Sequence, residues 1–341
     1  MVWAISNHSK KVVLRAGEML INAAAADDER LRSLEILSDW RAAHAYPMHA
    51  LLIFLRASAV KVDGSAVVVQ RLKRTPSILG KMSRYPDMKL NRMQDIGGCR
   101  AVVGTARHVD ELSKLIAASK TRHSLHKVHN YIQAPKNSGY RGVHLVFKYG
   151  GTKEAYSSYF VELQLRSKVQ HSWATAVEVV DFFTSQALKA SQGQAEWMRF
   201  FQLASAEFAL LEHRPIGAEM DGVDTYEELQ RLTASLNVID RLNAFAVSTK
   251  HVTSRDYAKS DYFLLELASD AQTISITQFR SSQLARATHL YLEREKVANG
   301  SHDVVLVAAG SMHALKSAYP NYFADTGAFI TNLQKALGRR R

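Results

Sequence analysis

The amino-acid sequence predicts an α/β protein in which a mixed sheet is flanked by helices, with N-terminal helices before it and a smaller C-terminal α/β domain after it. The length of 341 residues is enough for two or three domains. The apolar fraction of 47% and the charged fraction of 22% are ordinary for a globular chain. Strand-like and helical runs alternate through the middle, as in α/β folds. We therefore expect a helical element over residues 1–62, an α/β domain over 63–217 and a second one over 218–341.

The N-terminal segment is expected to be helical. Apolar side chains recur at intervals of three from Leu31 through Leu34 and Leu37 to Trp40, which indicates one face of an amphipathic helix. A second, apolar helix is expected over Met48–Val60.

The later segments alternate strands and helices. In the central segment the expected strands are Ala101–Val103, Val143–Phe147 and Tyr159–Leu165, and the expected helices are Lys168–Phe183 and Glu196–Leu211. A boundary is expected at Arg214–Gly217. Beyond it we expect a helix over Tyr226–Asn243 and strands over Tyr262–Leu267 and Thr273–Gln278. A helix over Ser282–Lys296, a strand over Asp303–Ala308 and a closing helix are expected to follow.

The composition excludes several classes of protein. The longest apolar run, Met48–Val60, is too short to span a membrane and contains Arg56. The basic residues from Lys10 onward do not precede an apolar run, so no signal peptide is expected. Cys99 is the single cysteine, which excludes an intramolecular disulfide and a cysteine-built zinc site. We expect a protein of the reducing cytoplasm without membrane contact.

The positive charge is concentrated in one segment. Residues 71–150 contain sixteen Lys and Arg but four Asp and Glu, so they account for the whole formal net charge of +12. Such a density predicts a polyanionic ligand, which would be nucleotide phosphates, RNA or DNA. A solvated basic face is the alternative, although such a face usually spreads its charge.

One predicted strand carries polar residues in a row. In the run Val161–Arg166, alternation places the apolar residues on one face and Glu162, Gln164 and Arg166 on the other. An acid, an amide and a guanidinium in one row resemble the floor of a site. A half-buried strand with a wet outer face is the plainer alternative.

Asp95 opens another predicted strand. Gly97 and Gly98 follow it and permit a ligand to approach the backbone closely. Mg²⁺ is usually held by one or two carboxylates together with substrate phosphates. Asp95 and Glu162, on neighbouring strands, could form such a pair, whereas Asp95 alone would be a turn residue.

Two further clusters are suited to binding phosphates. Arg71, Lys73, Ser77 and Lys81 place cations and a hydroxyl close together, which suits a nucleoside triphosphate because its charge must be neutralised before a nucleophile approaches. Their spacing fits neither a P-loop nor a Gly-rich kinase loop.

The loop Pro135–His144 is the second cluster. Its Pro, Asn and Gly residues predict a tight turn before a strand. Tyr140 is placed to stack on a base, while Lys136, Arg141 and His144 are suited to phosphate. Packing of Tyr140 within the fold is the alternative.

In this order, the four blocks resemble the synthetase domain of the RelA/SpoT-type alarmone synthetases. The resemblance runs from about Arg71 to Asp181, and its most specific parts are the loop Pro135–His144 and the strand Val161–Arg166. It implies a nucleotidyltransferase-like fold and a Mg²⁺-dependent enzyme that transfers the β,γ-pyrophosphoryl group of ATP to the ribose 3′-hydroxyl of GTP or GDP. The residue types fit, because phosphoryl-type transfer depends on positioning and charge neutralisation more than on covalent catalysis.

The resemblance also implies roles for individual residues. The residues expected to bind ATP are Arg71, Lys73, Ser77, Lys81 and Arg100. The residues expected to bind the acceptor are Lys136, Asn137, Tyr140, Arg141, His144 and Arg166. The expected catalytic residues are Glu162, Asp95 and Gln164. Among them, Asp95 and Glu162 are the expected Mg²⁺ ligands, and Glu162 is expected to help deprotonate the attacking hydroxyl.

The sequence departs from the family pattern near the acceptor. Asn130 stands where Asp is usual, and Gly142–Val143 stands where Ser-Leu is usual. The acceptor therefore stays open between GTP or GDP, an adenine nucleotide and the 3′ end of tRNA, which some toxin members modify. A catalytically inactive regulator that binds nucleotide or RNA is the alternative from another class, disfavoured because both carboxylates are present.

Residues 218–341 have no assignment from the sequence. Their aromatic cluster Ala318–Phe323 would pack internally or meet a partner. A regulatory ligand or protein acting through this segment, and a homo-oligomer, stay open. The segment before the synthetase-like region is too short for the hydrolase of bifunctional members, so hydrolysis of the product is not expected.

Overall fold

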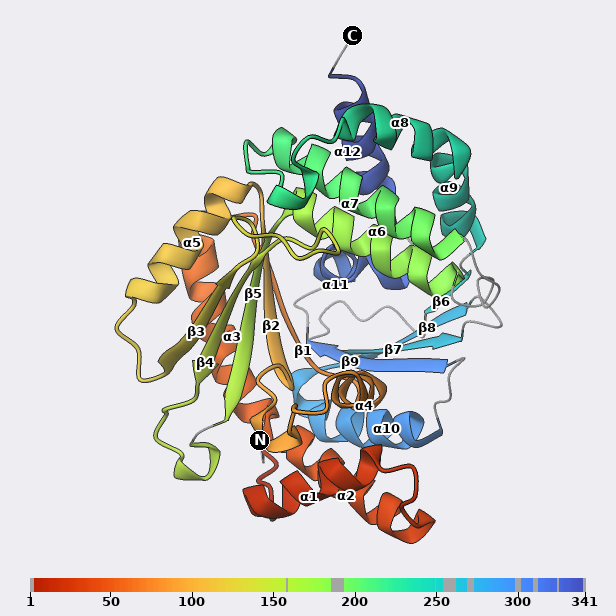
Figure 1. Ribbon diagram of the computed structural model, residues 1–341. Coiled ribbons are helices and arrows are strands. Elements are labelled where there is room, and N and C mark those ends of the chain that lie inside the picture. Colours follow the sequence, from red (N-terminus) through yellow and green to blue (C-terminus); the bar gives the residue numbers. More distant parts are fainter. Residues whose placement is uncertain are drawn as a thin grey trace.

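In the computed structural model, the described residues form one continuous sheet of nine strands in the order β3-β4-β5-β2-β1-β9-β7-β8-β6 (Figure 1). The described residues are 3–157, 159–184, 193–248, 250–253, 262–268, 273–297, 302–308, 312–323 and 325–339. The strands are β1 (Val67–Leu72), β2 (Gly97–Val103), β3 (Ser124–Asn130), β4 (Val143–Lys148), β5 (Phe160–Ser167), β6 (Lys250–Thr253), β7 (Tyr262–Ala268), β8 (Thr273–Phe279) and β9 (His302–Ala308). β2 and β5 are parallel, as are β6 and β8, and the other pairs are antiparallel. The predicted mixed α/β fold is thus confirmed.

Helices cover both faces of this sheet. They are α1 (Lys10–Ile21), α2 (Asp27–Ala43), α3 (Ala45–Val62), α4 (Thr75–Arg84), α5 (Ala106–Ala118), α6 (Lys168–Thr184), α7 (Gly193–Leu211), α8 (Thr225–Ser235), α9 (Val238–Ser248), α10 (Leu284–Val297), α11 (Met312–Ala318) and α12 (Gly327–Leu337). A short 3₁₀ helix, η5 (Pro320–Phe323), follows α11. In the described parts of the chain, no helix combines the length and apolarity needed to cross a membrane.

The alternation predicted for β5 is confirmed. Val161, Leu163 and Leu165 are fully buried in a core shared with Leu51 and Leu55 of α3. The alternate residues Glu162 and Gln164 point to the opposite face, where they line a small cavity together with Tyr319. Because a strand turns successive side chains to opposite faces, one face of the central sheet is apolar core and the other is left for polar side chains.

The C-terminal strands extend the same sheet. β9 pairs antiparallel with β1 through Gln70↔Ala308 and Arg71↔Val307. α11 and η5 pack on one face of this region and α10 on the other, as separate hydrophobic clusters show. The C-terminal segment therefore lies directly beside the strand that carries the predicted ATP-binding residues.

Two expected helices differ from the structure. Leu31 is 61% exposed whereas Leu37 is 1% exposed, although both were predicted on one apolar face. A helix has about 3.6 residues per turn, so a spacing of three falls short of a full turn at each step and the row winds around the helix. The single helix expected over Tyr226–Asn243 is instead α8 and α9, because Asn237 has a φ of +48° and breaks it.

Gly139 gives a stability prediction for the loop before β4. It has a φ of +88°, and a Cβ there would lie 3.0 Å from Cβ of Ser205 and 3.1 Å from the ring of Trp173. Gly139→Ala should lower the free energy of unfolding by at least about 1 kcal/mol, measured by urea denaturation, because a left-handed conformation is strained for Ala. Gly64→Ala is the control, since no atom lies within 4 Å of its added Cβ. Equal stability of the two variants would contradict the prediction.

Candidate active site

The polar face of the central sheet brings distant residues into rows. Arg71 of β1 and Glu162 of β5 both pair with Gly98 of β2, which lies between them. Since Gly98 has no side chain, the space between the guanidinium and the carboxylate stays open. In the next row, Arg100 and His144 flank Gln164. The predicted pairing of β2 with β5 is confirmed.

A small cavity of about 60 Å³ lies on this face. It is lined by Arg71, Lys73, Asp95, Gly98, Cys99, Arg100, Glu162, Gln164 and Tyr319. The structure therefore joins both expected Mg²⁺ ligands with three of the cations expected to bind ATP. Lys81 of α4 contacts Asp95 of this cavity, and Ser77 lies one turn earlier in the same helix.

Asp95 connects these cations. One carboxylate oxygen, Oδ2, accepts hydrogen bonds from Nζ of Lys73 at 3.1 Å and Nζ of Lys81 at 2.9 Å. The other oxygen, Oδ1, is buried and has no hydrogen-bond partner among the described residues. A buried oxygen without a donor fits a cation ligand, because hard cations such as Mg²⁺ bind carboxylate oxygens. Asp95 thus fits the role of Mg²⁺ ligand that the sequence resemblance implies.

Glu162 is held as an anion. Nδ1 of His144 lies 3.0 Å from its Oε2, and Nε2 of Gln164 donates to its Oε1 at 2.7 Å. Burial alone would raise the pKa of Glu162, but the hydrogen bonds from His144 and Gln164 and the charge of Lys81 lower it to about 2. The carboxylate is therefore ionised at neutral pH, which is the form that binds cations.

Aromatic and cationic side chains form the side of the candidate site that lies next to β4. The hydroxyl of Tyr140 lies 2.5 Å from Nε2 of His144 and accepts from Nη2 of Arg166 at 3.1 Å. Nζ of Lys136 lies 4.5 Å from the ring centre of Tyr131 and 5.1 Å from that of Tyr140. A chain of contacts therefore runs from Arg166 through Tyr140 and His144 to Glu162.

Sequence reasoning missed two members of this side. Tyr131 and His129 stack with ring centres 5.5 Å apart and planes 4° apart. His129 is in β3 and Tyr131 directly follows it, so their alternate positions before the loop could have indicated two side chains on one face of an extended segment. Asn130 lies between them, and its Oδ1 accepts from the backbone N–H of Ile132 and Gln133 at 3.0 and 3.2 Å. Asn130 thus supports the turn where the family usually has Asp.

Arg141, which is expected to bind the acceptor, is buried and hydrogen-bonded within the fold. Its buried guanidinium donates to the hydroxyl of Ser205 at 3.0 Å and to the carbonyls of Ile132, Pro215 and Ile216 at 3.1, 2.7 and 2.6 Å. Burial lowers the pKa of Arg141 to about 10, against the raising effect of Glu219 and Glu212. The side chain ties the loop to α7 and to the segment after it, so it is a structural support.

Asn137 also holds the loop. Its backbone carbonyl accepts a hydrogen bond of 2.7 Å from Nε2 of Gln202 on α7, and its side chain is exposed at the loop tip. Gly142 has a φ of +151°, and a Cβ there would lie 3.2 Å from the hydroxyl of Tyr140. The departure from Ser at this position therefore matches a close approach of Tyr140.

The C-terminal segment closes the donor side. The ring centre of Tyr319 lies 5.9 Å from the guanidinium carbon of Arg71 and 5.6 Å from that of Arg100. Tyr319 is 2% exposed, and Tyr322 beside it is also buried. Of the two alternatives for the cluster Ala318–Phe323, the structure shows internal packing. The sequence contains no signal for this contact, because it joins residues about 220 to 250 positions apart.

A match to a protein family covers the part of the chain that contains Arg71, Asp95, Tyr140 and Glu162. Residues 70–180 match the model of the "Region found in RelA / SpoT proteins". The GTP pyrophosphokinase YjbM of Bacillus subtilis (strain 168) is 32% identical over 111 residues, which are 32% of this chain and 52% of that protein. Residues 70–180 are thus similar to a region found in RelA/SpoT proteins, and the chain spans about half the length of this curated relative.

Solved structures resemble this region more loosely. The small alarmone synthetase 1 of Bacillus subtilis, bound to its product pppGpp, is 22% identical with a TM-score of 0.43, over 52% of this chain and 91% of that one. A GTP pyrophosphokinase family protein of Streptococcus pneumoniae is 20% identical with a TM-score of 0.41, over 55% of this chain and 92% of that one.

The lowered pKa of Glu162 predicts a pH-dependent stability. A carboxyl whose pKa is about 2 in the folded state, below its ordinary value of 4.5, stabilises the fold above pH 4.5, and this contribution is lost as the pH falls from 4.5 toward 2. The difference in free energy of unfolding between the wild type and Glu162→Gln, from urea titrations, should therefore shrink as the pH falls from 6 through that range. A difference that is constant over the same pH values would contradict it.

Proposed function

We propose that this chain is a Mg²⁺-dependent pyrophosphokinase that transfers the β,γ-pyrophosphoryl group of ATP to the ribose 3′-hydroxyl of GTP or GDP. The observation that carries the proposal is the single cavity that joins Asp95 and Glu162 with Arg71, Lys73 and Arg100. A triphosphate needs this density of cations, and two carboxylates suit the metal ion that accompanies it. The relative named GTP pyrophosphokinase, which is 32% identical over 111 residues, supports the choice of acceptor.

The donor side would neutralise and orient ATP. Lys73 and Lys81, which meet at Asp95, are placed to turn toward phosphate oxygens when a triphosphate enters. Asp95 and Glu162 would hold Mg²⁺, which would neutralise charge on the transferred group when bound. The planar guanidinium groups of Arg71 and Arg100 are suited to phosphate or to the face of the base.

The acceptor side would orient the nucleophile. Lys136, which lies over the rings of Tyr131 and Tyr140, is suited to the acceptor phosphate, and by turning toward it would leave the face of Tyr140 that it covers to a base. In the reaction the 3′-oxygen would form a bond to the β-phosphorus while the bond from that phosphorus to the α,β-bridging oxygen breaks, and AMP leaves with the electron pair. The hydroxyl proton would pass to the hydrogen-bonded pair that Glu162 forms with His144. Because a carboxyl of such low pKa accepts protons weakly, His144 would share this role.

Glu162→Gln tests the reaction. It keeps the size of the side chain but removes the charge that would bind Mg²⁺ and take the proton, so turnover should fall at least about 100-fold while ATP binding stays near that of the wild type. AMP release and product formation are measured with ATP and GTP. Glu154→Gln is the matched control, because Glu154 is exposed in the same domain. Turnover of Glu162→Gln close to that of the control would contradict the proposal.

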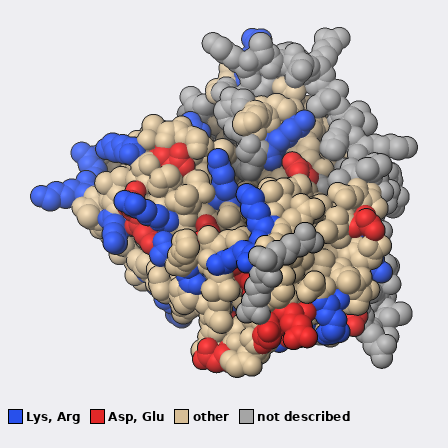
Figure 2. Space-filling model, turned by 90° about the horizontal axis from the view of Figure 1, so that it is seen from above, with Lys and Arg blue, Asp and Glu red and all other residues tan. Residues whose placement is uncertain are grey.

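A second candidate acceptor is the 3′ end of tRNA, and one observation favours it. Exposed cations follow α5, β3 and the connection between them: Arg107, Lys114, Lys120, Arg122 and Lys127. Figure 2 shows the molecule from above, with Lys and Arg gathered in the left half and the centre, on the side where α5 and β3 lie in Figure 1. Such a surface would contact several phosphates at once, so tRNA binding should weaken steeply with salt. Labelled product on tRNA in place of GTP would favour this acceptor.

We further propose that the C-terminal segment inhibits ATP binding. Tyr319 covers the guanidinium groups of Arg71 and Arg100, so the ring and ATP would compete for the same surfaces. Tyr319→Ala should therefore raise the apparent affinity for ATP by roughly tenfold or more, since two buried cation–π contacts are removed. The affinity is measured by titration with a non-hydrolysable ATP analogue. Tyr85→Ala, at a tyrosine that is 59% exposed, is the control. Unchanged or weaker ATP binding in Tyr319→Ala would contradict inhibition.

A further inference from the structure

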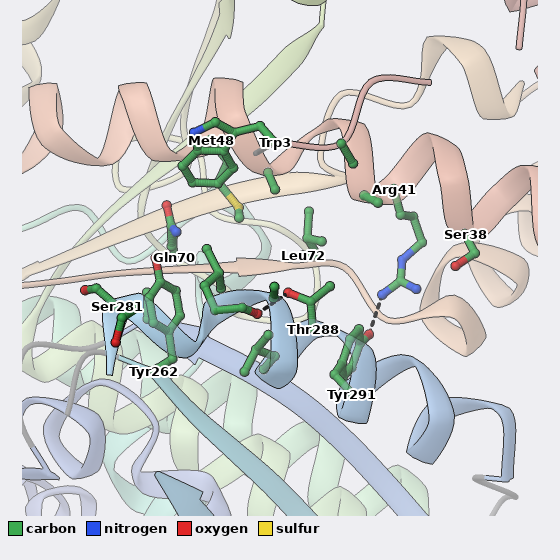
Figure 3. A pocket seen from close by; sticks show the side chains of 18 residues that line it. Trp3, Ser38, Arg41, Met48, Gln70, Leu72, Tyr262, Ser281, Thr288 and Tyr291 are labelled. Atoms are coloured by element: carbon green, nitrogen blue, oxygen red, sulfur yellow. Dashed lines mark hydrogen bonds between the residues drawn. The ribbon is translucent and has the colours of Figure 1, made fainter. Parts of the chain in front are cut away.

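A second and much larger cavity lies behind β1 (Figure 3). Its volume is about 610 Å³, within the range of roughly 300–1,000 Å³ that is typical of sites for small organic molecules. Gln70 and Leu72 of β1 line it, whereas Arg71 and Lys73 line the small cavity of the candidate active site on the other face. One strand thus separates the two cavities.

The walls of this cavity come from two segments of the chain. Trp3 and Met48 belong to the N-terminal segment, while Tyr262, Leu284 and Leu306 come from β7, α10 and β9. Between β1 and β9 the register records two residue pairs, so the cavity lies at a narrow junction of the sheet. A molecule bound there would contact both sides of the junction.

Gln70 supplies a buried acceptor at one end. Its side chain is 5% exposed, and its Oε1 has no hydrogen-bond partner among the described residues. A buried amide oxygen without a donor lowers stability, so such an atom in the wall of a cavity indicates a ligand that donates to it. In Figure 3, Tyr262 and Ser281 lie at the same end as Gln70.

Arg41 supplies a buried cation at the other end. It is 2% exposed, and its Nε donates to the carbonyl of Lys73 at 2.9 Å, its Nη1 to the hydroxyl of Thr75 at 3.0 Å and its Nη2 to the hydroxyl of Tyr291 at 2.5 Å. Figure 3 shows Arg41, Ser38 and Tyr291 together at this end. The guanidinium thus connects the cavity to the residues that lead into α4.

The middle of the cavity is mostly apolar. Leu72 and Met48 lie between the two polar ends in Figure 3, beside Thr288, whose hydroxyl donates to the carbonyl of Leu284 at 2.9 Å. An apolar body with one polar group at each end therefore complements the cavity.

We propose that this cavity binds a mostly apolar organic molecule that carries a hydrogen-bond donor for Gln70 and an anionic group for Arg41. Because its walls join the N-terminal and C-terminal segments, the bound molecule should stabilise the docked arrangement of the two. The binding is independent of the proposed reaction, so its test does not use pyrophosphoryl transfer.

The probe for the test is 1-anilinonaphthalene-8-sulfonate, which has an aromatic body, an N–H donor and a sulfonate. With the full chain we expect saturable fluorescence enhancement at one equivalent and a melting temperature that rises with probe concentration. Gln70→Leu should weaken binding roughly tenfold, as the loss of one hydrogen bond predicts, while its melting temperature without probe is equal to or above that of the wild type. A Gln70→Leu variant that binds as the wild type does would overturn the assignment of the donor.

A cavity-filling variant locates the binding. Thr288→Trp should abolish the saturable signal, because Thr288 lines the middle of the cavity. Ile53→Trp places the same side chain on the outer side of α3, where Ile53 is 57% exposed, and should bind as the wild type does. Each variant is first checked for a cooperative melting transition. Equal fluorescence in Thr288→Trp and Ile53→Trp, or no saturable binding to the wild type, would overturn the proposal.

Discussion

The positions of both cavities depend on the pleat of β1, which turns successive side chains to opposite faces of the sheet. Arg71 and Lys73 line the small cavity of the candidate active site, whereas Gln70 and Leu72 line the larger cavity behind the strand. The same strand pairs with β2 on one side and with β9 on the other. A shift of β1 by one residue would exchange the two sets, so its register fixes both cavities and the seat of the C-terminal segment.

The cations on the polar face set the chemistry. Burial and the neighbouring guanidinium groups of Arg166 and Arg71 lower the pKa of Arg100 to about 10, against the raising effect of Tyr319 and Glu178. Lys73 and Lys81 both contact Asp95. Close cations repel one another, so the face is stabilised when a polyanion enters it or when an aromatic ring covers it. That common requirement links the proposed catalysis on this face to the packing of Tyr319 over it.

The sequence predicted what depends on local patterns. The alternation in β5 placed Glu162, Gln164 and Arg166 on one face, whereas the expectation that Tyr140 and His144 share their site came from the family resemblance. The contacts of Arg141 could not be read in this way, because two of its partners, the carbonyls of Pro215 and Ile216, lie some 75 residues later. The cover formed by Tyr319 is equally long-range. Such contacts depend on tertiary packing, which a pattern of nearby residues does not encode.

The most direct test of the central claim is a transfer assay with ATP labelled at both the β- and the γ-phosphate, offered with Mg²⁺ to GTP, GDP, ADP or deacylated tRNA. The account predicts that both labels move together to one acceptor, in equal amounts and with equimolar release of AMP. This assay is carried out with the wild type and with Tyr319→Ala, in which the donor cavity is uncovered. Transfer of the γ-label alone, or no transfer by either protein to any of the acceptors, would contradict the account.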